Sequence, residues 1–356
     1  MIPLYIASTE AYAGKSLLCM ALGLKFRQEG LKISYFKPLG TLPAKVAGIT
    51  TDEDAMFIEH VLELRESLDV LCPVVLTSDL LNRAMRGQVS NLRERVTAAF
   101  AQLAEGKDVV LVGGAGNVLT TGKCVGLAGP QVAELLDARV LLIAKYHSAR
   151  AVDSLLVAKE ILGARFLGTI LNDVPPNQMT QVTEVVKPYL EQQGLVPLGA
   201  IPRDRILSSI SIEGLVETLN AEVLCAEDQL GELVEHFCVG AMNVESALRH
   251  FRRVPNKAVI TGGDRADVQL AALETSTKCI ILTGRLYPNN LILARASELG
   301  VPLLLVTDDT YTTVERVESL LGRVRPRDEK KIQRALELLE QCISLPTLYA
   351  ALGLWT

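Results

Sequence analysis

Short apolar runs rich in Val, Ile and Leu alternate along this chain with longer segments of helical period, and this alternation strongly constrains its fold. Strands that are buried on both faces and joined by crossover helices produce such a pattern. In the first half we expect strands at residues 3–7, 32–37, 108–112, 139–144, 166–171 and 196–201. Within residues 15–28, Leu18, Leu22 and Phe26 recur every four residues, which predicts a helix with one apolar face. The sequence therefore predicts an α/β fold with a parallel sheet flanked by helices.

A second series of strands and helices begins after the turn-like string IPRDRIL at residues 201–207. Strands are expected at 257–261, 278–283 and 301–307, each followed by a polar or glycine-containing turn and a helical pattern. At 356 residues the chain exceeds what one hydrophobic core usually organises. We therefore expect a first domain over residues 1–205, a smaller α/β domain over 206–325, and a C-terminal helix and tail over 326–356.

Composition and charge exclude several classes of protein. Hydrophobic residues make up 49% of the chain, which argues against a disordered protein. The net charge is −5 and residues 1–205 carry 21 basic and 21 acidic groups, so no basic stripe is available for a nucleic acid partner. No apolar run approaches the 18 or more residues that span a bilayer, and the start lacks a basic signal-peptide region. We therefore expect a cytoplasmic protein that binds neither nucleic acid nor membrane.

The first expected strand and helix are joined by the string STEAYAGKS at residues 8–16. In a phosphate-binding loop, backbone N–H groups at a helix N-terminus bind phosphate oxygens, a lysine reaches the β- and γ-phosphates, and the next hydroxyl ligates Mg²⁺. Gly14, Lys15 and Ser16 fill the last three positions, whereas Thr9 replaces the first glycine of the strict motif. We expect a nucleotide to contact Thr9, Gly14, Lys15, Ser16 and Leu17. The alternative is an ordinary strand-to-helix turn with a lysine in its first turn.

Further strings follow this loop in order: YFKPLG at 35–40, TDEDAMFI at 51–58, LVGGAGN at 111–117, GLAGPQVAELLDARVLLIA at 126–144 and GTILNDVP at 168–175. Together they resemble the dethiobiotin synthetase-type P-loop domain, especially the version at the N-terminus of long phosphotransacetylases. The resemblance covers about residues 1–205. It implies a P-loop NTPase-type sheet and a site for ATP or a related nucleotide.

The resemblance also implies roles for the charged residues near the loop. Lys15 would neutralise the β- and γ-phosphates, and Ser16 would hold Mg²⁺ together with Asp52 or Asp54. Lys37 would face the acceptor and the transferring phosphate, so Lys15 and Lys37 are the catalytic candidates. Each residue also has a simpler interpretation, because Lys37 can be a solvated strand-end lysine and the TDED run can be a helix N-cap.

Two further positions bear on the nucleotide. Asn172 occupies the place where the family's asparagine reads the base, although an Asn-Asp pair before two prolines is also a normal turn. Gly113 stands where the family has a metal-binding glutamate at the strand end. Loss of that carboxylate removes a Mg²⁺ ligand, so nucleotide binding can survive while turnover is in doubt.

The second half resembles the DRTGG domain, a module that joins the same P-loop domain to the catalytic domain in long phosphotransacetylases. The string GDRADVQLAAL at 263–273 carries the likeness, whereas Thr283, Gly284 and Arg285 replace the usual TGG. A possible anion or interface site consists of Gly262, Gly263, Asp264 and Arg265. In the structural alternative, Asp264 caps the following helix and Arg265 pairs with a carboxylate across a subunit or domain contact.

These observations lead to one functional hypothesis and two rivals. We expect a stand-alone nucleotide-binding regulatory protein that senses ATP or a related nucleotide and relays its state to a protein partner. The enzymatic rival is an ATP-dependent carboxylate–amine ligase of the dethiobiotin synthetase type, and weak ATPase activity is compatible with both. The third hypothesis is a nucleotide-free scaffold with a vestigial loop. A phosphotransacetylase domain would need a few hundred more residues, so that activity is not expected, whereas a homodimer is.

Overall fold

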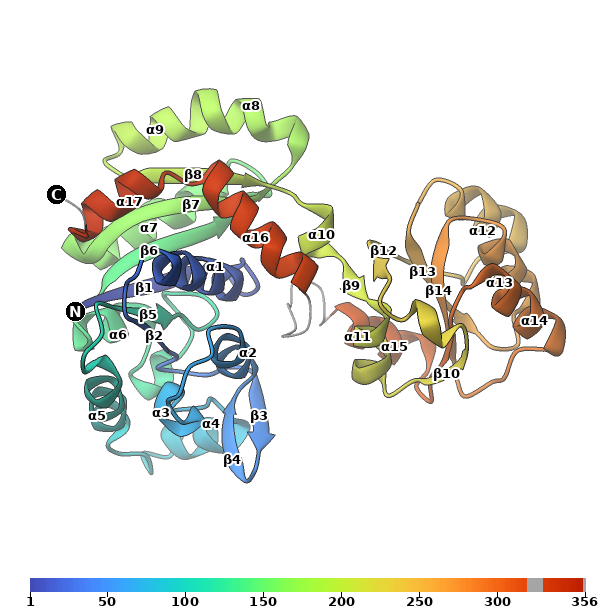
Figure 1. Cartoon of the computed structure of the whole chain (residues 1–356), viewed down its shortest axis with the longest axis horizontal. Coiled ribbons are helices and arrows are strands. Elements are labelled where there is room, and N and C mark those ends of the chain that lie inside the picture. The colour runs from blue at the N-terminus through green and yellow to red at the C-terminus, as the bar shows by residue number, and fades with distance from the viewer. Residues whose placement is uncertain (319–328, 355–356) are drawn as a thin grey trace. The chain divides into compact units, whose positions relative to one another are not determined.

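The computed structural model describes residues 1–318 and 329–354, which form two compact units (Figure 1). The first unit consists of residues 1–204 together with 329–354, and the second of residues 205–318. Within these described ranges, none of the helices is long and apolar enough to cross a membrane. Both units combine helices with a mainly parallel sheet, so the predicted α/β class is confirmed.

The first unit is built on a six-stranded sheet in the order β2-β5-β1-β6-β7-β8. Every neighbouring pair in it is parallel. The strands are β1 (Ile2–Ser8), β2 (Ile33–Phe36), β5 (Val109–Gly113), β6 (Arg139–Lys145), β7 (Phe166–Val174) and β8 (Pro197–Pro202). All six lie at or within a few residues of the positions that the apolar runs predict. A parallel sheet brings its strand ends to one edge, where ligands usually bind.

Helices cover both faces of this sheet. They are α1 (Lys15–Gln28), α2 (Glu53–Val61), α3 (Leu68–Leu71), α4 (Ser78–Met85), α5 (Leu92–Ala104), α6 (Gly129–Leu135), α7 (Ala151–Leu162), α8 (Met179–Gln181), α9 (Lys187–Gln192), α16 (Glu329–Cys342) and α17 (Leu345–Leu352). A π-helical segment (Val182–Val186) joins α8 to α9, and short 3-10 turns occupy Lys123–Val125, Gly163–Arg165 and Pro176–Gln178. The predicted helix over 15–28 matches α1 at both ends.

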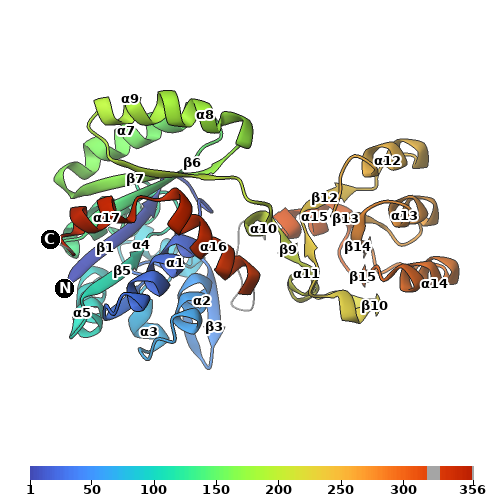
Figure 2. The ribbon, with the colours of Figure 1, turned by 45° about the horizontal axis from the view of Figure 1, so that its top comes forward.

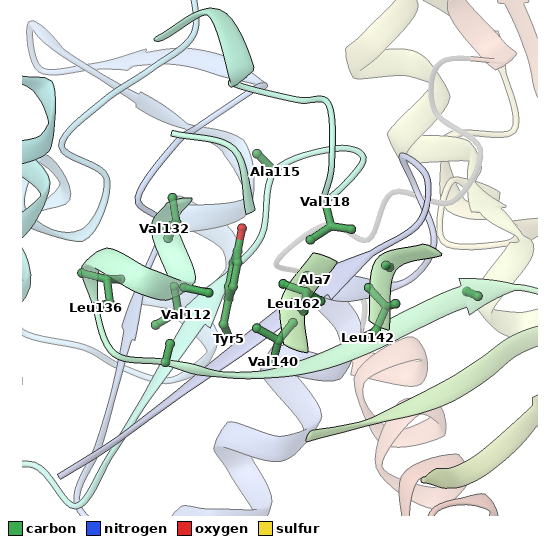
Figure 3. Packing of buried hydrophobic residues seen from close by; sticks show 14 of the residues in the cluster. Tyr5, Ala7, Val112, Ala115, Val118, Val132, Leu136, Val140, Leu142 and Leu162 are labelled. Carbon is green, nitrogen blue, oxygen red and sulfur yellow. The ribbon is translucent and has the colours of Figure 1, made fainter. Parts of the chain in front are cut away.

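The buried side chains of the strands alternate between the two faces. Tyr5 and Ala7 of β1 join Val112 and Val140 in one apolar cluster beneath α6 and α7, as Figure 3 shows. The cluster is packed and almost inaccessible to water, as the near-continuous apolar runs of the sequence require. The sheet is therefore a rigid support for the loops at its carboxyl edge.

In the first unit one strand pair was not expected from the sequence, and in the second unit residues 210–211, 222–225, 233–234 and 236–239 are strands that were not expected either. The antiparallel hairpin of β3 (Pro43–Val46) and β4 (Ile49–Asp52) is largely exposed and stands outside the main sheet. Its strands are only four residues long and carry few buried apolar side chains, so they leave no periodic signal.

The C-terminal helices α16 and α17 pack on the first unit. Helices α1 and α16 lie side by side (Figure 2), where Lys25 Nζ is 2.7 Å from Glu340 Oε1. Tyr349 of α17 donates a hydrogen bond to Glu29 Oε1 at 2.9 Å, and Gly199 of β8 forms a bridge with Ile343. The described part of the predicted tail over 326–356 therefore belongs to the body of the first unit.

The second unit has a five-stranded sheet in the order β10-β15-β14-β13-β12, in which β10 is antiparallel and the other pairs are parallel. Its strands are β10 (Glu222–Cys225), β12 (His236–Val239), β13 (Lys257–Gly262), β14 (Thr277–Thr283) and β15 (Leu303–Leu305), and β9 (Ile210–Ser211) pairs with β11 (Leu233–Val234). Its helices are α10 (Arg205–Ser208), α11 (Ile212–Leu219), α12 (Val244–Phe251), α13 (Ala266–Leu273), α14 (Asn290–Leu299) and α15 (Thr310–Glu318), with a 3-10 turn at Glu227–Gln229. Two apolar clusters, one on each face, form its core.

Candidate functional site

The loop between β1 and α1 lies at the carboxyl edge of the central strand. Gly14 precedes the helix with φ 98°, a left-handed conformation that favours glycine. A Cβ on Gly14 would also lie 2.5 Å from the Asn172 side-chain nitrogen, so a larger residue does not fit. The first turn of α1 contains no acidic residue. The N–H groups at this helix start are therefore well placed to bind an anion.

Lys15 folds its ammonium group back over this loop. Its Nζ donates to Ser8 Oγ at 2.7 Å, to the Gly116 carbonyl at 3.2 Å and to the Glu10 carbonyl at 3.5 Å. All three acceptors are uncharged, although Lys15 is only 8% exposed. Burial, and then the nearby Lys37 charge, lower the pKa of Lys15 to about 8. A buried cation that contacts only neutral oxygens is stabilised when an anion arrives.

Lys37 follows β2, and its buried ammonium group pairs with two carboxylates. Its Nζ lies 2.8 Å from Asp54 Oδ2 and 3.6 Å from Asp52 Oδ1, and the residue is 2% exposed. Burial disfavours the charge, but Asp52 and Asp54 outweigh it and raise the pKa of Lys37 well above its usual value. Lys37 is therefore not the solvated strand-end lysine of the simpler interpretation.

The two carboxylates have different roles. Asp52 is the N-cap of α2: its Oδ1 accepts the N–H of Asp54 at 3.0 Å, and its Oδ2 accepts those of Thr41 at 2.7 Å and Leu42 at 2.9 Å. This is the helix cap that the TDED run allowed. Burial would raise the pKa of Asp54, but Lys37 and a hydrogen bond from Ser16 lower it below its usual value. Asp54 is thus the carboxylate that reaches the start of α1.

Tyr35 is a member of this group that the sequence analysis missed. It lies on β2 two residues before Lys37, so both side chains point to the same face of the sheet. A Cβ on Gly113 of β5 would overlap Tyr35 Oη and lie 2.8 Å from Tyr35 Cζ. Tyr35 is 1% exposed, and burial raises the pKa of its hydroxyl well above the usual value. The alternation in YFK was the signal that places Tyr35 beside Lys37.

Asn172 of β7 connects the loop to a neighbouring strand. Its Nδ2 donates to the Ala13 carbonyl at 2.8 Å, and its own carbonyl accepts the N–H of Tyr146 at 2.8 Å. The structure therefore places Asn172 against the phosphate loop, and its contact with a base stays a prediction. A pocket of about 230 Å³ also adjoins the loop, between Thr9, residues 117–119 and α7.

The predicted ligands of a Mg²⁺ ion are Ser16 and one of Asp52 and Asp54. Both oxygens of Asp52 already accept backbone N–H groups, and Asp54 already faces the Lys37 ammonium. In the part of the chain that the structure describes, no group of three or more His, Cys, Asp or Glu side chains could hold a metal ion. Asp52 and Asp54 are thus occupied within the chain, and a metal ion that arrives with a nucleotide would have to displace Lys37 from Asp54 to reach Asp54 and Ser16.

The predicted site of the second unit lies at the turn from β13 to α13. Asp264 does not cap the helix, contrary to our expectation: Arg265 N donates to the Gly262 carbonyl at 3.1 Å, and Arg265 becomes the N-cap residue. The Arg265 guanidinium lies 3.2 Å from Asp267 Oδ1 and donates to the Met242 carbonyl at 3.0 Å. Its pairing is therefore local, within this unit. Gly263 is tightly enclosed, because a Cβ there would overlap the Leu286 carbonyl.

Comparison with known proteins agrees with this two-unit arrangement. The family model described as AAA domain matches residues 3–211, and the DRTGG domain model matches residues 214–320. A phosphate acetyltransferase from Synechocystis sp. is 27% identical over 96% of this chain and 50% of its own length. The ATP-dependent dethiobiotin synthetase BioD from Thermodesulfovibrio yellowstonii is 27% identical over 32% of this chain and 49% of its own length.

Among solved structures, the MinD cell division protein from Aquifex aeolicus has a TM-score of 0.37 and 16% identity, covering 58% of this chain and 84% of that one. The chain spans about half the length of the phosphate acetyltransferases that it matches. The chain therefore belongs to the AAA domain family of P-loop proteins and carries a DRTGG domain after it, as in the N-terminal half of phosphate acetyltransferases.

Proposed function

We propose that this chain is a nucleotide-binding regulatory protein. Its first unit senses ATP or a related nucleotide through the 8–16 loop, and its DRTGG unit relays the nucleotide state to a protein partner. The observation that carries the proposal is the buried Lys15 ammonium, whose three acceptors are all uncharged. In this proposal Lys15 pairs with the β- and γ-phosphates, while Thr9, Gly14, Ser16 and Leu17 line the loop around them.

The relatives support a regulatory role. This chain has a P-loop domain followed by a DRTGG domain, and 96% of it matches one half of a phosphate acetyltransferase. Acetyl transfer is named for the whole relatives, of which this chain spans about half. We therefore propose nucleotide sensing for the residues that the structure describes.

A second candidate is an ATP-dependent carboxylate–amine ligase. The pocket of about 230 Å³ beside the loop would admit a small acceptor, although Lys37 is not among the residues that line it. The overlap between a side chain at Gly113 and Tyr35 argues against this candidate, because it leaves no room for the glutamate that the family resemblance implies there. ADP release that requires a small acidic or diamino compound would favour the ligase over the sensor.

Calorimetric titration with ATP, ADP and GTP tests the proposal. We expect the wild-type chain to bind a nucleotide and Lys15→Ala to bind it at least about tenfold more weakly, since a charge-assisted contact contributes ~1.5–3 kcal/mol. Lys45→Ala is the matched control, because Lys45 is an exposed lysine of the β3–β4 hairpin. Absence of binding at millimolar nucleotide would exclude nucleotide sensing and leave the scaffold hypothesis.

The homodimer stays a prediction, which light scattering can test.

A further inference from the structure

The ammonium group of Lys37 sits where the two carboxylates of the site converge. Its Nζ is 2.8 Å from Asp54 and 3.6 Å from Asp52, and the group is shielded from water. Asp52 is fully buried, whereas the Asp54 side chain is 24% exposed, and a cation between two such carboxylates stabilises both of them. In this chain the cation is part of the protein.

The oxygen atoms that a metal ion would use are already engaged. The Asp52 oxygens accept the N–H groups of Thr41, Leu42 and Asp54, which fixes the β3–β4 region and the start of α2. Asp54 accepts from Lys37 and from the Ser16 hydroxyl. Mg²⁺ demands near-ideal octahedral oxygen coordination at about 2.0–2.1 Å, so it would have to displace Lys37 from Asp54 first.

The neighbouring strand end offers no further ligand. Gly113 has no side chain, and the space that its Cβ would take holds the Tyr35 hydroxyl. Tyr35 is buried and lies on the same face of the sheet as Lys37. An aromatic ring therefore fills the place from which strand β5 would present a third oxygen ligand.

From this geometry, and resting on the proposed nucleotide binding, we propose that the 8–16 loop binds its polyphosphate without a divalent metal ion, with the Lys37 ammonium as a built-in cation. Formal charges support the arrangement: Lys15 and Lys37 balance Asp52 and Asp54, the partly exposed Glu10 of the loop adds one negative charge, and the N–H groups of α1 attract the phosphates. Without Lys37 the site would be more negative and would repel a polyphosphate unless a metal bridged the two. Tyr35 is a positioning residue, because its ring prevents strand β5 from presenting a metal-ligating side chain at position 113.

The first test uses the wild-type chain and the metal alone. Mn²⁺, a paramagnetic substitute for Mg²⁺, is titrated into nucleotide-free protein and followed by electron paramagnetic resonance. We expect no saturable site, whereas one Mn²⁺ per chain that Mg²⁺ displaces would overturn the proposal. This readout is independent of nucleotide binding, so it decides on the metal site even if the proposed function fails.

The second test measures ATP affinity by calorimetry in EDTA and in excess Mg²⁺. We expect the two dissociation constants to agree within about threefold, and ATP binding at least tenfold tighter with Mg²⁺ would overturn the metal-free proposal while supporting nucleotide sensing. Lys37→Met should make ATP binding depend on Mg²⁺, because Asp54 loses its cation. Lys45→Met, on the exposed hairpin, is the matched control and should behave as wild type.

A variant that leaves Lys37 in place provides a second route if Lys37→Met fails to fold. Tyr35→Ala combined with Gly113→Glu removes the ring and adds a carboxylate in the freed space. We expect this double variant to gain a Mn²⁺ signal, with Tyr35→Ala alone as its control. A folded double variant that binds no Mn²⁺ would show that Tyr35 does not control metal access and would overturn that part of the proposal.

Discussion

At the scale of single residues, Lys15 shows how burial changes the pKa of a charged side chain. Its ammonium contacts Ser8 Oγ and two backbone carbonyls, which hold it without neutralising it. The pKa of about 8 follows from burial first and from Lys37 second. An arriving phosphate favours the charged form and raises this pKa, so nucleotide binding and protonation of Lys15 are linked.

The pH dependence of nucleotide binding follows from this linkage. Below pH 8 Lys15 is charged before and after binding, so affinity changes little; above pH 8 the free protein loses the proton that the complex needs, so affinity falls. We expect binding about tenfold weaker at pH 9 than at pH 7. Calorimetry at pH 9 in two buffers of different ionisation enthalpy should show proton uptake. Lys15→Ala should lose that uptake, and its persistence would assign the proton to another group.

A second residue-scale prediction concerns the contact between Gly113 and Tyr35. Gly113→Ala places a methyl group over the Tyr35 hydroxyl and should destabilise the first unit by about 1–3 kcal/mol, as overpacking does. Differential scanning calorimetry measures this decrease in the stability of the first unit. Tyr35→Phe in the same chain should restore part of it, because the nearest atom then becomes Cζ at 2.8 Å.

Gly231→Ala is the control for that prediction, because nothing lies within 4 Å of a Cβ built there. It should change the unfolding temperatures little. If Gly113→Ala also left the unfolding temperatures unchanged, Tyr35 would have room to move aside. The claim that its ring prevents β5 from presenting a metal ligand would then fail.

At the scale of elements, the sequence located α1 and the six main strands because their signals are local. Apolar runs and a four-residue recurrence depend only on neighbouring residues, and the loop at 8–16 sits where strand meets helix. The sequence did not predict the β3–β4 hairpin because its short strands are mostly exposed. The sequence did not predict that α16 and α17 pack on the first unit, because this packing depends on contacts with α1 and β8 that are more than 100 residues away in the sequence.

The contact of β8 with the C-terminal helices can be broken at Gly199. A Cβ there would overlap the Cys342 carbonyl, and backbone cannot swing away as a side chain can. We expect Gly199→Ala to speed hydrogen exchange in α16 and α17 while β1 and β6 stay protected. Lys25→Ala, which removes only a partly exposed ion pair with Glu340, should cost about 0–1 kcal/mol and leave exchange nearly unchanged. If hydrogen exchange in α16 and α17 stayed unchanged in Gly199→Ala, the contact between β8 and these helices would tolerate a side chain.

At the scale of the whole molecule, the two units have separate cores and separate sheets. The phosphate loop belongs entirely to the first unit, so a nucleotide should stabilise that unit directly. Any effect on the DRTGG unit would have to be transmitted, which is what the regulatory proposal requires.

Calorimetric unfolding with and without ATP separates these effects. At one hundred times its dissociation constant, ATP should stabilise the first unit by about 2.7 kcal/mol. We expect ATP to raise the unfolding temperature of the first unit and Lys15→Ala to abolish this increase. An increase in the unfolding temperature of the DRTGG unit alone would mean that the nucleotide binds outside the 8–16 loop.

The sequence by itself determined the α/β class, the six main strands of the first unit and α1, the place of the 8–16 loop between strand and helix, and the DRTGG character of the second half. Local periodicity and motif order carry that information. Only the tertiary structure decided that Asp52 is a cap while Asp54 faces Ser16, that Asn172 binds the loop through Ala13, and that Tyr35 fills the space above Gly113. These relations depend on the sheet order β2-β5-β1-β6-β7, which brings distant segments to one edge and which no local pattern encodes.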